Sequence, residues 1–200
     1  MTFLVASCNH WIGFHIVNAL LEEGYEVDGV SGEAGNENLP MFFGRNSLFT
    51  MVNANERKDY DIVIIIDETL NMERIESKRI IKIGEISDGS ENTVHIKNLL
   101  LYGEWMAMNE KGIYSNNEFI PFNSKTFQDE AIYIKDFTKA LIQWLKTDEL
   151  PSNLHVKSSK NKDDKGLKLE NTIYLRDNIP KEEKLKTVLT HYKEFIKLYE

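Results

Sequence analysis

A thiol and two imidazoles lie close together near the start of the chain, at Cys8, His10 and His15. A neighbouring imidazole or a helix N-terminus lowers the pKa of a thiol and makes it a nucleophile. The spacing fits no known zinc pattern, so we expect a buried, unreactive thiol at Cys8 and a structural role for His15. Two interpretations of His10 stay open: an anion ligand at the start of the following helix, or a polar loop side chain.

A pair of carboxylates, Asp67 and Glu68, follows the most apolar segment of the chain. Paired carboxylates at the end of a strand can exchange protons with a substrate or bind Mg²⁺. The simpler interpretation, which we favour, is that they begin a helix whose N-terminal dipole favours negative charge.

The spacing of apolar residues predicts the helices and strands that position these residues. Thr2–Ala6 is a short apolar run and predicts a buried strand. Trp11–Glu23 repeats its apolar residues with helical spacing, and Gly24 is placed to end that helix. Tyr25–Val30 predicts a second strand, so the start of the chain predicts a β-α-β unit with parallel strands. Asp61–Ile66 is continuously apolar and β-branched, which is typical of a central strand covered on both faces.

Weaker patterns predict the remaining elements. We expect further strands over residues 49–53, 79–83, 94–101, 154–156 and 172–175. We expect loop over 31–47, a short helix over 104–110, irregular or edge structure over 116–128, and helices over 136–145 and 180–198. Asn178 is the expected cap of the last helix. The link Gly84–Thr93 is too short for a normal crossover helix.

Three stretches resemble the extended short-chain dehydrogenases/reductases, the group of NAD-dependent epimerases and dehydratases. They read FLVASCNHWIGFH (3–15, continuing through LLEEGYEV at 20–27), LYGE (101–104) and IYIKDFTKAL (132–141). The resemblance implies a Rossmann-like, doubly wound, mostly parallel sheet with helices on both faces. It implies a nucleotide-binding-type core over 1–101, a reduced C-terminal portion over 102–200, and NAD or NADP as cofactor.

The residues at the cofactor-binding positions differ from the pattern of that group. Its loop reads G-x-x-G-x-x-G, and Ser7, His10 and Gly13 stand at the three glycine positions. The first glycine permits positive φ, the second lets the backbone approach pyrophosphate, and the third allows close helix–strand packing. At the end of the second strand, Ser31 replaces the acid that binds ribose. The cofactor-binding residues that the resemblance implies are Ser7, Asn9, His10, Trp11, Ile12, Gly13 and Ser31.

The catalytic pattern of that group is absent from this sequence. It is a Tyr-x-x-x-Lys pair, in which the lysine charge lowers the pKa of the phenol for proton transfer. No tyrosine of this chain has a lysine four residues later. Ser87 lies near the expected serine position, without partners. We therefore predict no catalytic residue.

Composition limits the partners. The chain has 200 residues with 24 basic and 32 acidic side chains, a formal net charge of −8, which disfavours nucleic acid. One cysteine excludes an internal disulfide and no apolar run reaches membrane-spanning length, so we expect a cytoplasmic protein with no membrane partner. Candidate partners are a dinucleotide or another anionic small molecule, a protein partner, or a second copy of the chain.

Three functions remain open at this point. The first is a catalytically degenerate epimerase/dehydratase-like protein, a pseudoenzyme that acts as a ligand-binding regulator or partner subunit. The second is an active NAD(P)-dependent oxidoreductase or epimerase with altered catalytic residues. The third is a structural or interaction protein with no small-molecule site.

Overall fold

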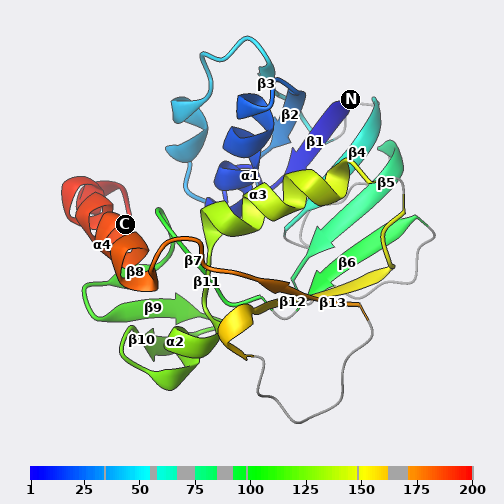
Figure 1. The fold of residues 1–200 in the computed structure, drawn as a ribbon. Helices are drawn as coiled ribbons and strands as arrows, with labels where there is room; N and C mark the ends of the chain where they lie inside the picture. The colour runs from blue at the N-terminus through cyan, green and yellow to red at the C-terminus, as the bar shows by residue number, and fades with distance from the viewer. Residues whose placement is uncertain are drawn as a thin grey trace. The chain divides into compact units, whose positions relative to one another are not determined.

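A central parallel sheet organises the chain in the computed structural model (Figure 1). The structure describes residues 1–33, 35–54, 58–66, 75–84, 92–97, 99–147, 149–161 and 171–199. The sheet has eight strands in the order β13-β12-β6-β5-β4-β1-β2-β3. The run β3-β2-β1-β4-β5-β6 is the strand order of a dinucleotide-binding Rossmann fold, in which the order reverses between β1 and β4.

The helices and strands have the following bounds. The strands of the large sheet are β1 Thr2–Ala6, β2 Glu26–Val30, β3 Phe49–Met51, β4 Asp59–Ile65, β5 Glu76–Ile83, β6 Thr93–Lys97, β12 Asn153–Ser158 and β13 Thr172–Leu175. The shorter strands are β7 Leu101–Tyr102, β8 Met108–Asn109, β9 Gly112–Ser115, β10 Glu118–Pro121 and β11 Ile132–Tyr133. The α-helices are α1 Trp11–Glu22, α2 Lys125–Glu130, α3 Ile134–Leu145 and α4 Lys181–Phe195, and the 3-10 turns are η1 Leu39–Phe42, η2 Ser159–Asn161 and η3 Ile196–Leu198.

The central strands form because their sequences are apolar on both faces. Leu4 and Val5 of β1 and Ile64 of β4 are fully buried. β1 pairs in parallel with β2 on one side and with β4 on the other. The predicted β-α-β unit and the central position of the Asp61–Ile66 segment are therefore confirmed. Gly24 has a φ of +79° just after α1, the left-handed conformation in which a glycine ends a helix.

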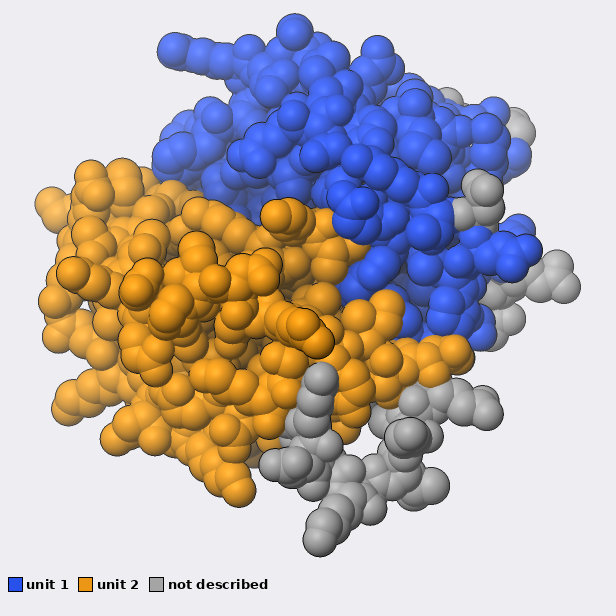
Figure 2. Space-filling view, in the orientation of Figure 1, with its two compact units in different colours: residues 1–97, 142–154 blue, residues 98–141, 155–200 orange. Residues whose placement is uncertain are grey.

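The described chain divides into two compact units, coloured separately in Figure 2. The first contains residues 1–97 and 142–154 and includes β1 to β6. The second contains residues 98–141 and 155–200. The chain passes between the units at the end of β6, within α3 and within β12.

The second unit has small sheets of its own. β8, β9 and β10 form an antiparallel three-stranded sheet, and β7 pairs in parallel with β11 (Figure 1). Lys181, at the start of α4, is 1% exposed. Its ammonium donates to the backbone oxygens of Phe127, Gln128 and Ala131, at 2.7 to 3.0 Å. It thereby binds three carbonyl groups at the end of α2, of which that of Phe127 also accepts from the Ala131 N–H.

Several predicted elements differ from the structure. The predicted strand 94–101 is two strands, β6 and β7, which belong to different sheets. The predicted helix 104–110 is a turn followed by β8, because Trp105 adopts a φ of +67° that no helix accommodates. The segment 116–128 contains the edge strand β10 but also the start of α2, whose cap is Ser124. Pro180, and not Asn178, precedes α4, and no side chain caps that helix.

The strand predicted over 172–175 is present with these bounds. The strands predicted over 49–53, 79–83 and 154–156 and the helices over 136–145 and 180–198 are present with shifted ends. Residues 85–91, most of the short link after β5, lie outside the described residues. No helix in the described segments combines the length and the apolar character needed to cross a membrane.

Candidate functional site

The loop between β1 and α1 begins with a strained residue. Ser7 has a φ of +59°, in the left-handed region where a Cβ is unfavourable. Ser7 thus has the positive φ that the first glycine of the pattern permits. Its hydroxyl is buried and has no hydrogen-bond partner. A Cβ added at Gly32, the second residue after β2, would lie 2.5 Å from that hydroxyl, so the loop and the end of β2 are packed together.

Asn9 joins the same two segments by hydrogen bonds. Its side-chain oxygen accepts from the Gly32 N–H at 2.7 Å, and its side-chain nitrogen donates to the Gly32 carbonyl at 2.9 Å. The Asn36 N–H donates to the backbone oxygen of Asn9 at 2.9 Å. A Cβ on Gly35 would lie 2.2 Å from the Asn9 amide carbon. The segment after β2 therefore lies directly on the loop, and Asn9 is 2% exposed.

His10 caps the helix that it precedes. Its Nδ1 accepts from the backbone N–H of Ile12 at 3.3 Å, so the imidazole satisfies one of the donors that a helix N-terminus leaves without an intrahelical partner. Such donors are the groups that bind an anion at a helix N-terminus. The imidazole occupies one of these donors, and both interpretations of His10 remain predictions. Trp11 and Ile12 are half-buried in the first turn.

Gly13 retains the role of the third glycine in the loop. A Cβ at this position would lie 2.3 Å from the backbone oxygen of Ser7 and 3.1 Å from the Cα of Cys8. No side chain fits there unless the helix moves away from the loop. The close approach of α1 to β1 thus depends on this residue.

Cys8 is buried between the loop and the neighbouring strands. Burial raises the pKa of its thiol to about 12, and hydrogen bonds from its own backbone and the Ser31 side chain lower it only in part. The Cys8 sulfur lies 3.7 Å from the Met51 sulfur. The thiol is thus protonated near neutral pH, which is the opposite of what a nucleophile needs. His15 is also buried and its ring lies edge-on to that of Phe14.

The second unit contains a buried acid that the sequence analysis did not single out. Glu104, after β7, is 5% exposed. It accepts from the Tyr133 hydroxyl at 3.0 Å and from the Lys135 ammonium at 2.6 Å. Burial first, and the charge of Glu104 second, raise the pKa of Tyr133. All three residues lie in the segments LYGE and IYIKDFTKAL, which the sequence analysis quoted. Their contact could not be read from the sequence, because it depends on the pairing of β7 with β11.

Tyr102 completes the buried polar groups of this region. Its side chain is fully buried, and its hydroxyl has no hydrogen-bond partner. Burial raises its pKa, and the nearby charges of Asp177 and Asp136 raise it further. Neither Tyr102 nor Tyr133 has the lowered pKa that proton transfer from a phenol requires near neutral pH.

Asp67, Glu68 and Ser87 lie outside the described residues. A cavity of about 530 Å³ lies at the amino ends of β5 and β6. In a parallel sheet, ligands bind at the opposite, carboxyl edge. Its lining residues are Lys78, Arg79, Asn92, Thr93, Val94, Glu149, Leu150 and Ser152.

No family model and no curated protein matches the chain, and the similar proteins are all solved structures. One similar structure is a dTDP-glucose 4,6-dehydratase from Bacillus anthracis in complex with NAD. It is 10% identical, the match covers 99% of this chain and 98% of that one, and the TM-score is 0.64. The chain has the fold of the extended short-chain dehydrogenases/reductases. The chain is also similar to vestitone reductase from alfalfa, at 11% identity over 100% of this chain and 99% of that one, with a TM-score of 0.62. A third similar structure is Pal from Bacillus thuringiensis, at 8% identity over 97% of this chain and 99% of that one, with a TM-score of 0.64.

Proposed function

We propose that this chain is a catalytically degenerate relative of the NAD(P)-dependent epimerases, dehydratases and reductases. It acts as a ligand-binding regulator or as the subunit of another protein, and carries out no hydride transfer. The observation that carries the proposal is the pair of hydrogen bonds between the Asn9 side chain and the Gly32 backbone.

Those bonds lie where this fold receives a dinucleotide. The pyrophosphate contacts the loop after β1, and the adenosine ribose contacts the end of β2. In this chain, Asn9 connects the loop to the end of β2, and the segment that ends at Asn36 is bonded to it. Ser7 replaces the glycine that permits positive φ, and His10 replaces the glycine that would let the backbone approach a phosphate. These contacts favour the interpretation that the chain's own residues fill the space beside the loop in which a dinucleotide would bind.

The tyrosines support the same proposal. No tyrosine in the sequence is followed by lysine at the fourth position. The raised pKa values of Tyr102 and Tyr133 keep both phenols protonated. Tyr133 donates to the Glu104 carboxylate and is engaged in that bond. An active oxidoreductase would need a phenol with the opposite shift.

Thermal unfolding with and without ~1 mM NAD⁺, NADH, NADP⁺ or NADPH tests the proposal. A dinucleotide with a Kd of ~10 μM would stabilise the fold by about 2.7 kcal/mol. That corresponds to a rise in Tm of about 5–10 °C for a chain of this length. We expect no rise for the natural chain. A clear rise with any of the four would show that the loop after β1 still binds a dinucleotide, would contradict a loop filled by the chain's own residues, and would favour an active enzyme.

A variant provides the matched comparison. The Ser7→Gly, His10→Gly double substitution restores the glycines of the G-x-x-G-x-x-G pattern and retains Gly13. If these two side chains contribute to the loss of dinucleotide binding, the double variant gains a dinucleotide-dependent rise in Tm that the natural chain lacks. The partner is then sought by affinity capture with the natural chain, with the double variant as the comparison.

A further inference from the structure

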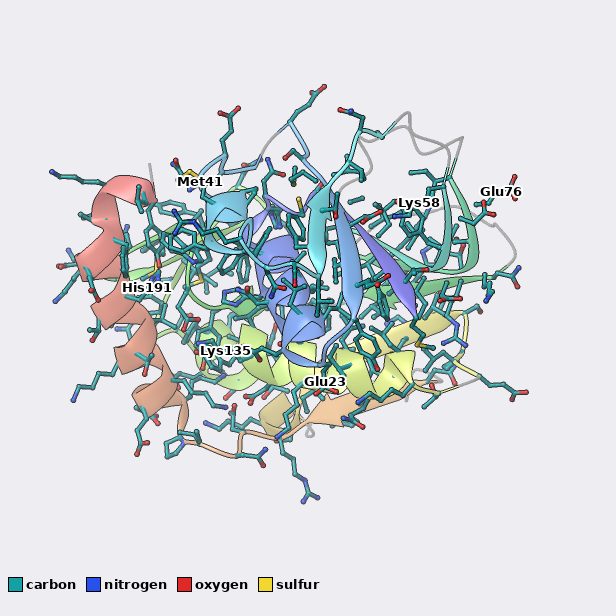
Figure 3. The ribbon with its side chains drawn as sticks, turned by 90° about the horizontal axis from the view of Figure 1, so that it is seen from above. Glu23, Met41, Lys58, Glu76, Lys135 and His191 are labelled. Atoms are coloured by element: carbon teal, nitrogen blue, oxygen red, sulfur yellow. The ribbon has the colours of Figure 1, made fainter. Side chains whose placement is uncertain are left out.

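The amino edge of the central sheet carries a cavity that is separate from the cofactor position. Dinucleotides bind this fold at the carboxyl edge, whereas the cavity of about 530 Å³ lies where β5 and β6 begin. Glu76, labelled in Figure 3, is the first residue of β5 and marks this edge. The volume is in the range of pockets that hold small molecules. All the lining residues belong to the first compact unit, because they lie within 78–94 and 149–152.

Hydrogen bonds hold the wall of the cavity that follows α3. The Arg79 guanidinium donates to the Thr147 carbonyl at 2.9 Å, just beyond the end of that helix. The His95 N–H donates to the Ser152 carbonyl at 2.8 Å. The segment between Thr147 and Ser152 is therefore fixed at both ends, so the cavity is formed by the chain itself, as ligand sites usually are.

Charges of both signs line the cavity. Lys78 and Arg79, near the start of β5, are cations, and Glu149 is a carboxylate. In the sheet, β6 lies between β5 and β12, and the segment 149–152 leads into β12. The backbone positions that carry the cations and the carboxylate therefore lie on different sides of β6. Thr93 and Val94, each 5% exposed, line the cavity at the start of β6.

We propose that this cavity binds a free α-amino acid with a small apolar side chain. The inference rests on the proposed function, because it gives the regulator its ligand. Arg79 binds the carboxylate, since a guanidinium has five N–H donors and a bond to the Thr147 carbonyl is compatible with another to an anion. Glu149 binds the ammonium group, and Val94 and Leu150 contact the apolar side chain. A ligand with a single charge would use only one of the two signs of charge.

Lys78 adds positive potential and is not the main contact. Its ammonium binds the Asp61 carboxylate at 2.6 Å, and its side chain is 81% exposed, where solvent screens the charge. Asp61 is not among the residues that line the cavity. Arg79 and Glu149 are thus the pair that selects a ligand with both a carboxylate and an ammonium group.

NMR titrations of the full-length chain test this assignment. L-alanine, L-valine and L-leucine are added up to ~10 mM, and the amides of Asn92, Thr93 and Ser152 report on the cavity. The amino acid that binds is then compared with its deamino and decarboxy analogues, which for leucine are 4-methylpentanoate and 3-methylbutylamine. We expect saturable shifts with the amino acid and binding about tenfold or more weaker for each analogue, which lacks one charge-assisted contact. No shift with any of the three, or an analogue that binds as tightly, overturns the proposal.

Two variants locate the binding groups. Glu149→Gln changes an exposed residue and should weaken binding of the amino acid while leaving that of the carboxylate analogue unchanged. Arg79→Gln should weaken both. Glu118→Gln on β10 and Arg176→Gln after β13 are the matched controls at exposed residues and should change neither. If Glu149→Gln binds the amino acid as tightly as the natural chain, or a control loses binding, the proposal fails.

The same spectra distinguish a failure of this proposal from a failure of the proposed function. A dinucleotide that shifts the Gly32 amide, at the loop after β1, would contradict a loop filled by the chain's own residues, whichever amino acids bind. Amino acids that leave the Asn92 and Thr93 amides unshifted would overturn only the present inference, because the contacts of that loop do not depend on this cavity.

Discussion

Replacing Asn9 by alanine removes the contact on which the proposed function depends. The substitution breaks two hydrogen bonds to the Gly32 backbone, at 2.7 and 2.9 Å. A hydrogen bond of this kind contributes about 0.5–1.5 kcal/mol net, so the two together predict a loss of about 1–3 kcal/mol in the free energy of unfolding. At about 2–4 °C per kcal/mol, the Tm should fall by roughly 2–12 °C.

Urea unfolding and amide hydrogen exchange measure this loss in independent ways. The unfolding midpoint gives the free energy, and the Gly32 amide, which donates to Asn9, should lose its protection. Asn46→Ala is the matched control, because its side chain bonds only the exposed N–H of Leu48 among the hydrogen bonds described for it. It should change the free energy of unfolding by less than about 0.5 kcal/mol. If the Asn9→Ala chain is as stable as the control and its Gly32 amide is still protected from hydrogen exchange, Asn9 does not hold the loop after β1 to the end of β2.

Three further substitutions test other parts of the structure. Ser7→Gly relieves a left-handed residue at a φ of +59° and removes a buried unpartnered hydroxyl, so it should raise the free energy of unfolding by about 1 kcal/mol; a decrease measured in urea would contradict the strain. Gly13→Ala places a Cβ 2.3 Å from a backbone oxygen and should cost about 1–3 kcal/mol in the same assay, more than Gly44→Ala, whose nearest contact is at 3.3 Å. Lys181→Met removes the ammonium that donates to three carbonyl oxygens at the end of α2, of which only that of Phe127 keeps the Ala131 N–H, and should lower stability by about 1.5–3 kcal/mol; Lys186→Met, on the exposed face of α4, should have little effect, and equal melting temperatures for the two would refute the role of Lys181 at the end of α2.

The sequence by itself determined the elements whose patterns are local. Thr2–Ala6 forms a strand and Trp11–Glu22 a helix because hydrophobic spacing specifies which face of each segment is buried. The same holds for the central strand β4, whose unbroken apolar run can be satisfied only between two neighbours. Gly13 was also predictable, because a known loop pattern assigns it to close helix packing, and the structure places it there.

Predictions from local patterns were wrong where the backbone departs from regular helix or strand conformation. The segment 94–101 is apolar enough for one strand, yet it divides into β6 and β7, and nothing in its composition marks the break. The apolar spacing of 104–110 suits a helix, but Trp105 takes a positive φ, and its N–H donates to the Tyr199 hydroxyl. That partner is 94 positions away, beyond the reach of any window along the sequence.

Only the tertiary structure decided how the candidate sites are built. Asn9 and Gly32 are 23 positions apart, and they meet because β1 and β2 are parallel neighbours whose ends lie at one edge of the sheet. Glu104 meets Tyr133 because β7 pairs with β11. A residue's type fixes which hydrogen bonds it can form, and its spacing fixes which face of an element it occupies. Which donor meets which acceptor depends on strand order and register, which arise only when distant segments bury their apolar faces against one another.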